Sequence, residues 1–294
     1  SGRVTGVQTC ALPIWDEDVA NAEAQRRAIL TRDADEPLDR TAIWFSDLGA
    51  LTRLPDELAE IDGLTRLIIG DAKTPDGAHH GPPQRLQDIA VLAKLTNLTE
   101  LNLTDSGVTD LQLIAGLQKL QILEMSETRI TDVAPLTNLT ALQNLYLSGI
   151  RIADIAPLTN LTALRSLYMI GTEIADIAPL TNLTALQNLD LSSTQITDIA
   201  PLAKLTALQN LDLSDSQIAD ITSLANLTAL QNLDLSRTQI ADFTPLAKLT
   251  ALQNLNLGGT QIADLHILLQ IPTFASLNAK SLSFARTPLA KSDR

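Results

Sequence analysis

A 22-residue repeat dominates the middle of this 294-residue chain. The segment LQNLDL starts at Leu186, Leu208 and Leu230, and the same period runs without slippage over residues 98–273, giving eight units. With the first Leu of a unit as offset 0, offsets 0, 3, 5, 10, 13, 16 and 19 hold Leu, Ile, Val, Met or Phe in all eight units. Self-similarity at a fixed period indicates a stack of short structural units.

The spacing inside a unit predicts a short strand followed by a tight return path. Offsets 3 and 5 alternate with polar residues, so we expect them to point to one face of a strand. The apolar positions from offset 10 onward recur every three residues, which suits a 3₁₀-like turn. One unit cannot bury both faces alone. Neighbouring units must therefore stack, with their strands in a parallel sheet spaced by about 4.8 Å.

The unit LxxLxLxxTxIxDIxPLxxLTx resembles a leucine-rich repeat, in particular the 22-residue subclass of bacterial internalins. The resemblance covers residues 98–273 strongly and residues 41–97 more loosely. It implies an α/β fold: a solenoid with a parallel β-sheet on its concave face and 3₁₀, short helical or irregular segments on its convex face. The chain departs from the Asn common at offset 8 and carries Ser or Thr there, except at Ile150. A hydroxyl can still bond the turn backbone, so the expected fold is unchanged.

The first residues differ from the rest of the chain. Residues 4–14 read VTGVQTCALPI, which resembles a translated sequencing adaptor, so we expect residues 1–14 to be non-native and disordered. Cys10, the only cysteine, then carries no information on the redox compartment. The absence of a signal peptide likewise carries no information on secretion. A location at the cell surface, outside the cell or in the cytoplasm therefore stays open.

The other flanking segments break the regular period in different ways. We expect a helical N-terminal cap, then irregular leading repeats with an inserted Gly-, Pro- and Asp-rich loop, and at the other end a degenerate repeat or a truncated end. These segments are 15–40 for the cap, 41–97 for the leading repeats with the loop at about 71–84, and 274–294 for the last segment.

An aspartate occupies offset 12 in every regular unit, just before the expected helical turn. There its carboxylate can accept hydrogen bonds from free backbone N–H groups, as an N-cap residue does. We therefore interpret the column as structural capping and not as a metal or acid array. Its members are Asp110, Asp132, Asp154, Asp176, Asp198, Asp220, Asp242 and Asp264.

Composition and motifs disfavour catalysis, metal binding and nucleic-acid binding. The formal net charge of -13 argues against a surface for phosphates. The sequence has no Gly-rich phosphate loop, no HExxH and no catalytic triad, so we expect no enzyme, cofactor or metal site. His79 and His80, with Asp71 and Asp76 nearby, are interpreted as a solvated loop, and His266 as a surface residue. No apolar run approaches the roughly 20 residues that span a membrane.

Both tyrosines of the chain, Tyr146 and Tyr168, fall at offset 4 of neighbouring units. Offsets 2, 4, 6 and 7 should line the concave face, and tyrosines there suit a binding hot spot. The alternative is drift from the consensus, with the two rings packing on each other. Around the pair we place Glu124, apolar side chains, two glycines and three arginines: Ile150, Ile170, Gly149, Gly171, Arg129, Arg151 and Arg165.

The next three units carry Asp190, Asp212 and Asp234 at the same offset, beside Asn188, Asn210 and Asn232. Like charges at strand spacing repel by about a few tenths of a kcal/mol in water. A basic partner would relieve this repulsion. The alternative is recent duplication of near-identical units.

These features predict a monomeric, non-catalytic module that binds a protein or peptide on its concave face. The tyrosine patch would supply affinity, and the acidic residues would steer a basic partner. Two alternatives stay open: the sensor arm of a larger signalling or defence protein whose effector domain lies outside this sequence, and a structural spacer.

Overall fold

The structure is a computed structural model. It describes residues 42–45, 52–69, 86–262, 266, 269 and 282–283. Several expectations fall outside these residues: the non-native start at 1–14, the helical cap at 15–40, the inserted loop at 71–84 with His79 and His80, Asp264, and all of 274–294 except two residues.

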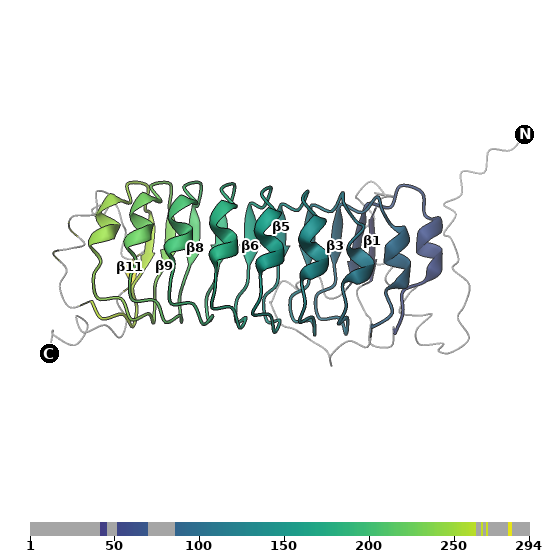
Figure 1. Cartoon of the computed structure of the whole chain (residues 1–294), viewed down its shortest axis with the longest axis horizontal. Coiled ribbons are helices and arrows are strands. Elements are labelled where there is room, and N and C mark those ends of the chain that lie inside the picture. The colour runs from purple at the N-terminus through teal and green to yellow at the C-terminus, as the bar shows by residue number, and fades with distance from the viewer. Residues whose placement is uncertain are drawn as a thin grey trace, which may run out of the picture.

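Among the described residues, eleven short strands form one parallel sheet whose spatial order equals the chain order. Equivalent offsets pair across neighbouring strands, as Leu189 does with Leu211. Figure 1 shows the resulting elongated stack. The strands are β1 (Ala42–Phe45), β2 (Arg66–Ile69), β3 (Glu100–Asn102), β4 (Ile122–Glu124), β5 (Asn144–Tyr146), β6 (Ser166–Tyr168), β7 (Asn188–Asp190), β8 (Asn210–Asp212), β9 (Asn232–Asp234), β10 (Asn254–Asn256) and β11 (Leu282–Ser283).

The return paths contain 3₁₀ helices, which lie in a row in front of the strands in Figure 1. Five of them carry Pro in the first turn, where the missing N–H has no intrahelical partner to lose. The predicted parallel-sheet solenoid with 3₁₀ segments is thus confirmed. The helices are η1 (Asp56–Glu60), η2 (Ala90–Lys94), η3 (Gln112–Ile114), η4 (Ala134–Asn138), η5 (Ala156–Asn160), η6 (Ala178–Asn182), η7 (Ala200–Lys204), η8 (Thr222–Asn226) and η9 (Thr244–Lys248).

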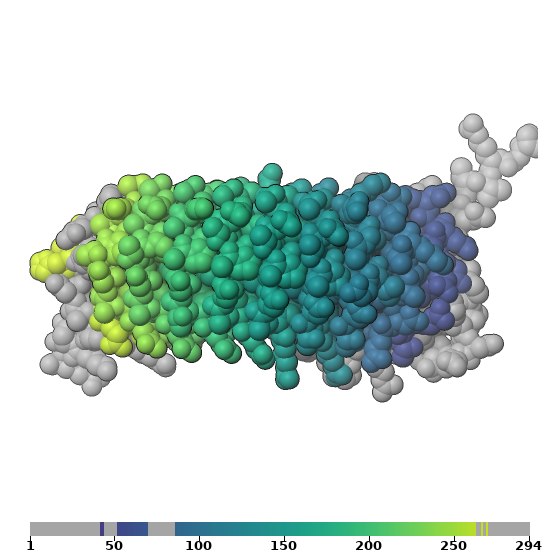
Figure 2. All heavy atoms as spheres, in the orientation of Figure 1, coloured from purple at the N-terminus to yellow at the C-terminus, as the bar shows by residue number. Residues whose placement is uncertain are grey.

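The core lies between the sheet and the row of 3₁₀ helices. From Leu98 to Ile262, every apolar residue at the seven core offsets is buried, with no more than 3% of its surface exposed. Figure 2 shows neighbouring units in continuous contact along the convex face. Because each unit packs only on its neighbours, the core is a long strip that all units share.

The turn after each strand has one fixed backbone conformation. The residue at offset 7 has a φ between +55° and +76° in all eight units, although only three of the eight are Gly. Gly149 and Gly171 therefore meet a backbone requirement of every unit, because glycine adopts positive φ without a steric penalty. The column consists of Asp105, Glu127, Gly149, Gly171, Ser193, Asp215, Arg237 and Gly259.

The hydroxyl column at offset 8 closes this turn from inside. In six units the side-chain hydroxyl donates to the carbonyl oxygen at offset 5 over 2.6–2.8 Å, as Thr194 does to Leu191. Ile150 takes the same inward position with only 1% of its surface exposed. Its expected place on the concave surface was therefore wrong, because offset 8 points into the core.

The aspartates at offset 12 organise the start of each 3₁₀ helix. In all seven described units, Oδ1 accepts a hydrogen bond from the backbone N–H two residues later over 2.7–2.9 Å. The N-cap position itself belongs to the following apolar residue, for example Ile155 after Asp154. The aspartate thus lies one residue before the N-cap and accepts from the first turn, as expected of a capping residue. Hydrogen bonds from Thr222 and Thr244 lower the pKa of Asp220 and Asp242, respectively.

Candidate functional site

The two tyrosines form a stacked pair on the concave face. Strands β5 and β6 place Tyr146 directly opposite Tyr168, and their ring centroids lie 4.8 Å apart with an angle of 2° between the ring planes. Because this separation matches the usual strand spacing of about 4.8 Å, the sheet itself aligns the rings. Burial raises the pKa of the Tyr146 hydroxyl, and the nearby Tyr168 and Glu124 raise it further.

Apolar side chains extend the tyrosine pair. Ile170 has 39% of its surface exposed and is one of only three large hydrophobic residues so exposed in the described part of the chain. Ile122, on β4, is half-buried at offset 2, where the later units carry Asn or Ser. We call Ile122, Tyr146, Tyr168 and Ile170 the tyrosine patch. Sequence reasoning missed Ile122, although its departure from the Asn at offset 2 was visible.

The charged residues expected around the tyrosine patch are spread more widely. Glu124 lies opposite Tyr146 in the strand register and accepts a 2.8 Å hydrogen bond from Asn102. Arg165 directly precedes β6, whereas Arg129 and Arg151 follow the turns after β4 and β5; all three are exposed. The arginines therefore flank the patch from both ends of the strands.

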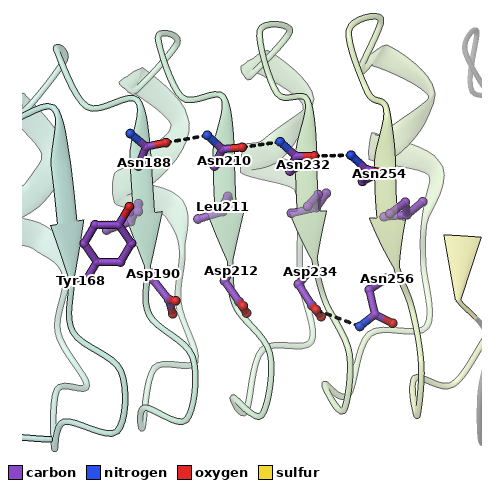
Figure 3. Close-up of a pocket in the computed structure, with 13 residues that line it drawn as sticks. Tyr168, Asn188, Asp190, Asn210, Leu211, Asp212, Asn232, Asp234, Asn254 and Asn256 are labelled. Atoms are coloured by element: carbon purple, nitrogen blue, oxygen red, sulfur yellow. Dashed lines mark hydrogen bonds between the residues drawn. The ribbon is translucent and has the colours of Figure 1, made fainter. Parts of the chain in front are cut away.

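The three aspartates form one straight row on β7, β8 and β9, as Figure 3 shows. Each Oδ1 accepts the backbone N–H two residues later, over 2.8–3.0 Å, which closes the turn after the strand. Asn102 and Asn256 make the same bond in their units. The row, Asp190, Asp212 and Asp234, thus has a structural use that sequence reasoning did not foresee. We call it the acidic row.

The charged form of Asp212, the central member of the acidic row, is disfavoured by its surroundings. Burial raises the pKa of Asp212; hydrogen bonds from Ser214 oppose this, and the charges of Asp190 and Asp234 add to it. Among the described residues, no Lys or Arg forms an ion pair with any of the three carboxylates. The row therefore carries negative charge that the described part of the chain leaves uncompensated.

We expect Asp212→Asn to stabilise the fold at pH 7. A carboxyl whose folded pKa is raised contributes stability below its unfolded pKa of about 3.9, and this contribution is lost as pH rises through the folded value. The amide keeps the turn acceptor, as Asn256 does. The gain in urea midpoint should therefore grow as pH rises from about 3.9 to above the folded pKa.

The exposed Glu173 provides the control for this measurement. Glu173→Gln removes one negative charge outside the acidic row and should leave the urea midpoint nearly unchanged. Equal stabilisation by Asp212→Asn at pH 3 and pH 7 would contradict an electrostatic origin.

A row of side-chain amides runs parallel to the acidic row at offset 2. The first asparagine, Asn188, donates from Nδ2 to the Ser166 hydroxyl over 2.9 Å. Each later Nδ2 donates to Oδ1 of the preceding asparagine. Figure 3 shows this ladder as a line of dashed bonds. The bonds fix the orientation of the amides, so their remaining N–H groups have defined positions. We call this row, Asn188, Asn210, Asn232 and Asn254, the amide row.

A hollow of about 380 Å³ lies between the two rows and extends over β6–β10. Tyr168 lines one end and Asn256 the other. The leucines between the rows, such as Leu211, are almost fully buried. The floor of the hollow is therefore strand backbone, and its two sides are polar.

Within the described ranges, no group of three or more His, Cys, Asp or Glu residues is placed to hold a metal ion. The same residues include no helix long and apolar enough to cross a membrane. His266 is exposed.

Comparison with known proteins gives a consistent result. A family model described as Leucine Rich repeats (2 copies) matches residues 118–158, 140–182, 184–226 and 228–269. The structure resembles an internalin (inlF) from Listeria monocytogenes, with a TM-score of 0.69 and 27% identity over 92% of this chain and 82% of that chain. It also resembles internalin C2 (inlC2) of the same species, with a TM-score of 0.61 and 34% identity over 67% of this chain and 88% of that chain.

A more distant similarity concerns the fold alone. The plant peptide hormone receptor RGFR1, in complex with RGF2, has a TM-score of 0.61 at 21% identity, over 80% of this chain and 38% of that chain. A search of curated proteins gave no match.

Proposed function

This chain belongs to the leucine-rich-repeat proteins, and we propose that it is a non-catalytic module that binds a protein or peptide on its concave face. The observation that carries the proposal is the stacked Tyr146–Tyr168 pair. Five other units use Asp or Asn at this offset to close the turn after the strand. The short Asx side chain suits this bond and a tyrosine ring does not, so the two tyrosines replace a structural contact. A binding role accounts for that loss better than drift does.

The tyrosine patch has the chemistry of a hot spot. Tyrosine offers a large contact area, loses little side-chain entropy and ends in a polar hydroxyl. The rings are only partly buried, and Ile170 adds exposed apolar surface beside them. Clusters of exposed apolar surface on an otherwise polar face mark interaction sites. The patch would therefore supply most of the affinity.

The acidic row would select and orient the partner. An uncompensated line of charge attracts an oppositely charged molecule and speeds its association. The partner we propose presents a basic surface to β7–β9 and apolar groups to the tyrosine patch. The plant receptor RGFR1, in complex with RGF2, offers a precedent for ligand binding by a protein of this fold.

Fluorine NMR tests this proposal directly, because the chain has only two tyrosines and both lie in the patch. Protein made with 3-fluorotyrosine should show two resonances, and Tyr168→Phe assigns them. Ligands are first selected from a displayed library of protein fragments on the immobilised chain. We expect selected ligands to shift or broaden both resonances, whereas unselected fragments leave them unchanged. Selected ligands that bind but alter neither resonance would overturn the proposal.

A further inference from the structure

We propose that the hollow over β6–β10 holds an extended basic segment of the partner in a polyproline II conformation, with Lys or Arg side chains three residues apart. The segment would run along the stack, across the strands, from Tyr168 toward Asn256. This inference rests on the proposed function and specifies the chemistry and backbone of the bound segment. It rests on the shape of the hollow, on both polar rows and on the ring at its end.

The repeat spacing matches a polyproline II helix. Strands lie about 4.8 Å apart, so Asp190 and Asp234, two strands apart, are separated by roughly 9.6 Å along the stack. A polyproline II helix rises about 3.1 Å per residue with three residues per turn, which returns a side chain to the same face every 9.3 Å or so. In a β-strand, side chains return to the same face every two residues, a distance of about 6.7 Å. This matches neither one strand interval of the sheet, about 4.8 Å, nor two, about 9.6 Å.

The hollow is elongated, because its lining residues come from five neighbouring strands, β6 to β10. Four strand intervals of about 4.8 Å give it a length of roughly 19 Å along the stack. About six residues of polyproline II, at about 3.1 Å per residue, span that length. A single extended chain can therefore follow the hollow from end to end.

Both polar rows can bind such a segment. A carboxylate accepts up to about four hydrogen bonds, and the turn amide takes one at each member of the acidic row. The Ser192 hydroxyl takes a second at Asp190, and the Asn256 side-chain amide takes a second at Asp234. Capacity remains for Lys or Arg. Each amide of the amide row uses one N–H in the ladder, so its second N–H can donate to a ligand carbonyl. Polyproline II backbone makes no internal hydrogen bonds, so its carbonyl groups are free to accept.

Tyr168 completes the match at one end of the hollow. Figure 3 shows its ring beside the acidic row, with its hydroxyl toward the amide row. Pro-rich segments dock into grooves lined by aromatic rings, because the preformed helix loses little entropy on binding. The ring would pack against a proline or against the aliphatic stem of a basic side chain.

Fluorescence anisotropy with two labelled peptides of identical composition tests the proposal on the full chain. One peptide has four Lys-Pro-Pro repeats; the other has the same four lysines in one block, followed by the eight prolines. We expect the repeat peptide to bind at least tenfold more tightly than the block peptide. Asp190→Asn with Asp234→Asn should weaken its binding at least tenfold. Asn is native at this offset in Asn256, so this double variant keeps the turn bonds.

The matched control removes two negative charges elsewhere. Glu60→Gln with Glu173→Gln changes exposed residues that do not line the hollow and should leave the affinity for the repeat peptide within about twofold, because solvent-exposed charges are screened by salt. Equal affinity for the two peptides would overturn the inference, as would unchanged binding by the Asp190 and Asp234 double variant.

The two proposals can fail separately. If library ligands move the fluorotyrosine resonances but the Lys-Pro-Pro peptide does not bind, the extended basic segment is wrong and the concave-face function stands. If selected ligands bind without moving either resonance, the tyrosine patch is wrong, whatever the peptide does.

Discussion

Replacing Leu191 by Ala is expected to lower the free energy of unfolding by about 3 kcal/mol, within the 2–5 kcal/mol usual for buried leucines. Leu191 is fully buried at offset 5, in the middle of the regular stack. The variant loses the transfer free energy of the removed methyl groups and leaves a cavity that the rigid repeat cannot close. Urea denaturation followed by circular dichroism measures the change.

The exposed Leu113 is the matched control. It has 38% of its surface exposed, so Leu113→Ala removes the same atoms and should cost well under 1 kcal/mol. Each unit of a solenoid contacts only its neighbours. A cavity at Leu191 therefore weakens the coupling between the two halves of the stack and should also broaden the transition. Equal destabilisation by both variants would show that the 22-residue period does not define the core.

The core and the sheet were predictable from sequence because every unit places the same type of residue at the same offset. Leucine recurs at offset 3, for example at Leu189, Leu211 and Leu233, so all eight units indicate the same buried strand face. The same columns predict that Tyr146 lies beside Tyr168, and β5 and β6 pair these two residues. Periodicity gives neighbours directly when a parallel sheet keeps equivalent positions in register.

Details that depend on side-chain orientation could not be predicted in this way. Ile150 looked like a surface departure because it replaced a polar residue, but that polar column points into the core. The pattern predicted that Asp154 accepts from the backbone just before the turn, as it does, but not that the apolar Ile155 holds the N-cap position itself. A polar residue inside a turn and one on the surface give the same sequence pattern. Only the hydrogen-bond partner separates them.

The polar rows of the concave face show the same difficulty. The alignment of Asp190, Asp212 and Asp234 followed from the period, but their bonds to the turn amides did not. The amide ladder likewise depends on each Asn rotamer. The row spacing is therefore predictable from sequence. The capacity left for a ligand is not, because it depends on which bonds the fold already uses.

Removing both rings with Tyr146→Ala and Tyr168→Ala is expected to weaken the binding of a selected ligand at least 100-fold. Hot-spot side chains each contribute about 2 kcal/mol or more when truncated, and about 1.4 kcal/mol corresponds to a tenfold change in Kd. Tyr168 lines the end of the hollow and stacks on Tyr146, so the pair lies where the hollow meets the rest of the tyrosine patch. Isothermal titration calorimetry measures the loss.

Three further variants separate the loss of contacts from a loss of fold. Tyr146→Asn with Tyr168→Asn places the residue of Asn102 and Asn256 at offset 4, which allows the turn bond and should weaken binding as strongly as the alanines do. Ile170→Ser restores the residue of most units and should weaken binding less, because one exposed side chain is lost. The convex-face variant Leu113→Ala should bind normally. Unchanged affinity in the asparagine variant would place the interface elsewhere. The rings would then contribute nothing to binding, and the replacement of Asp or Asn by Tyr146 and Tyr168 would have no functional reason.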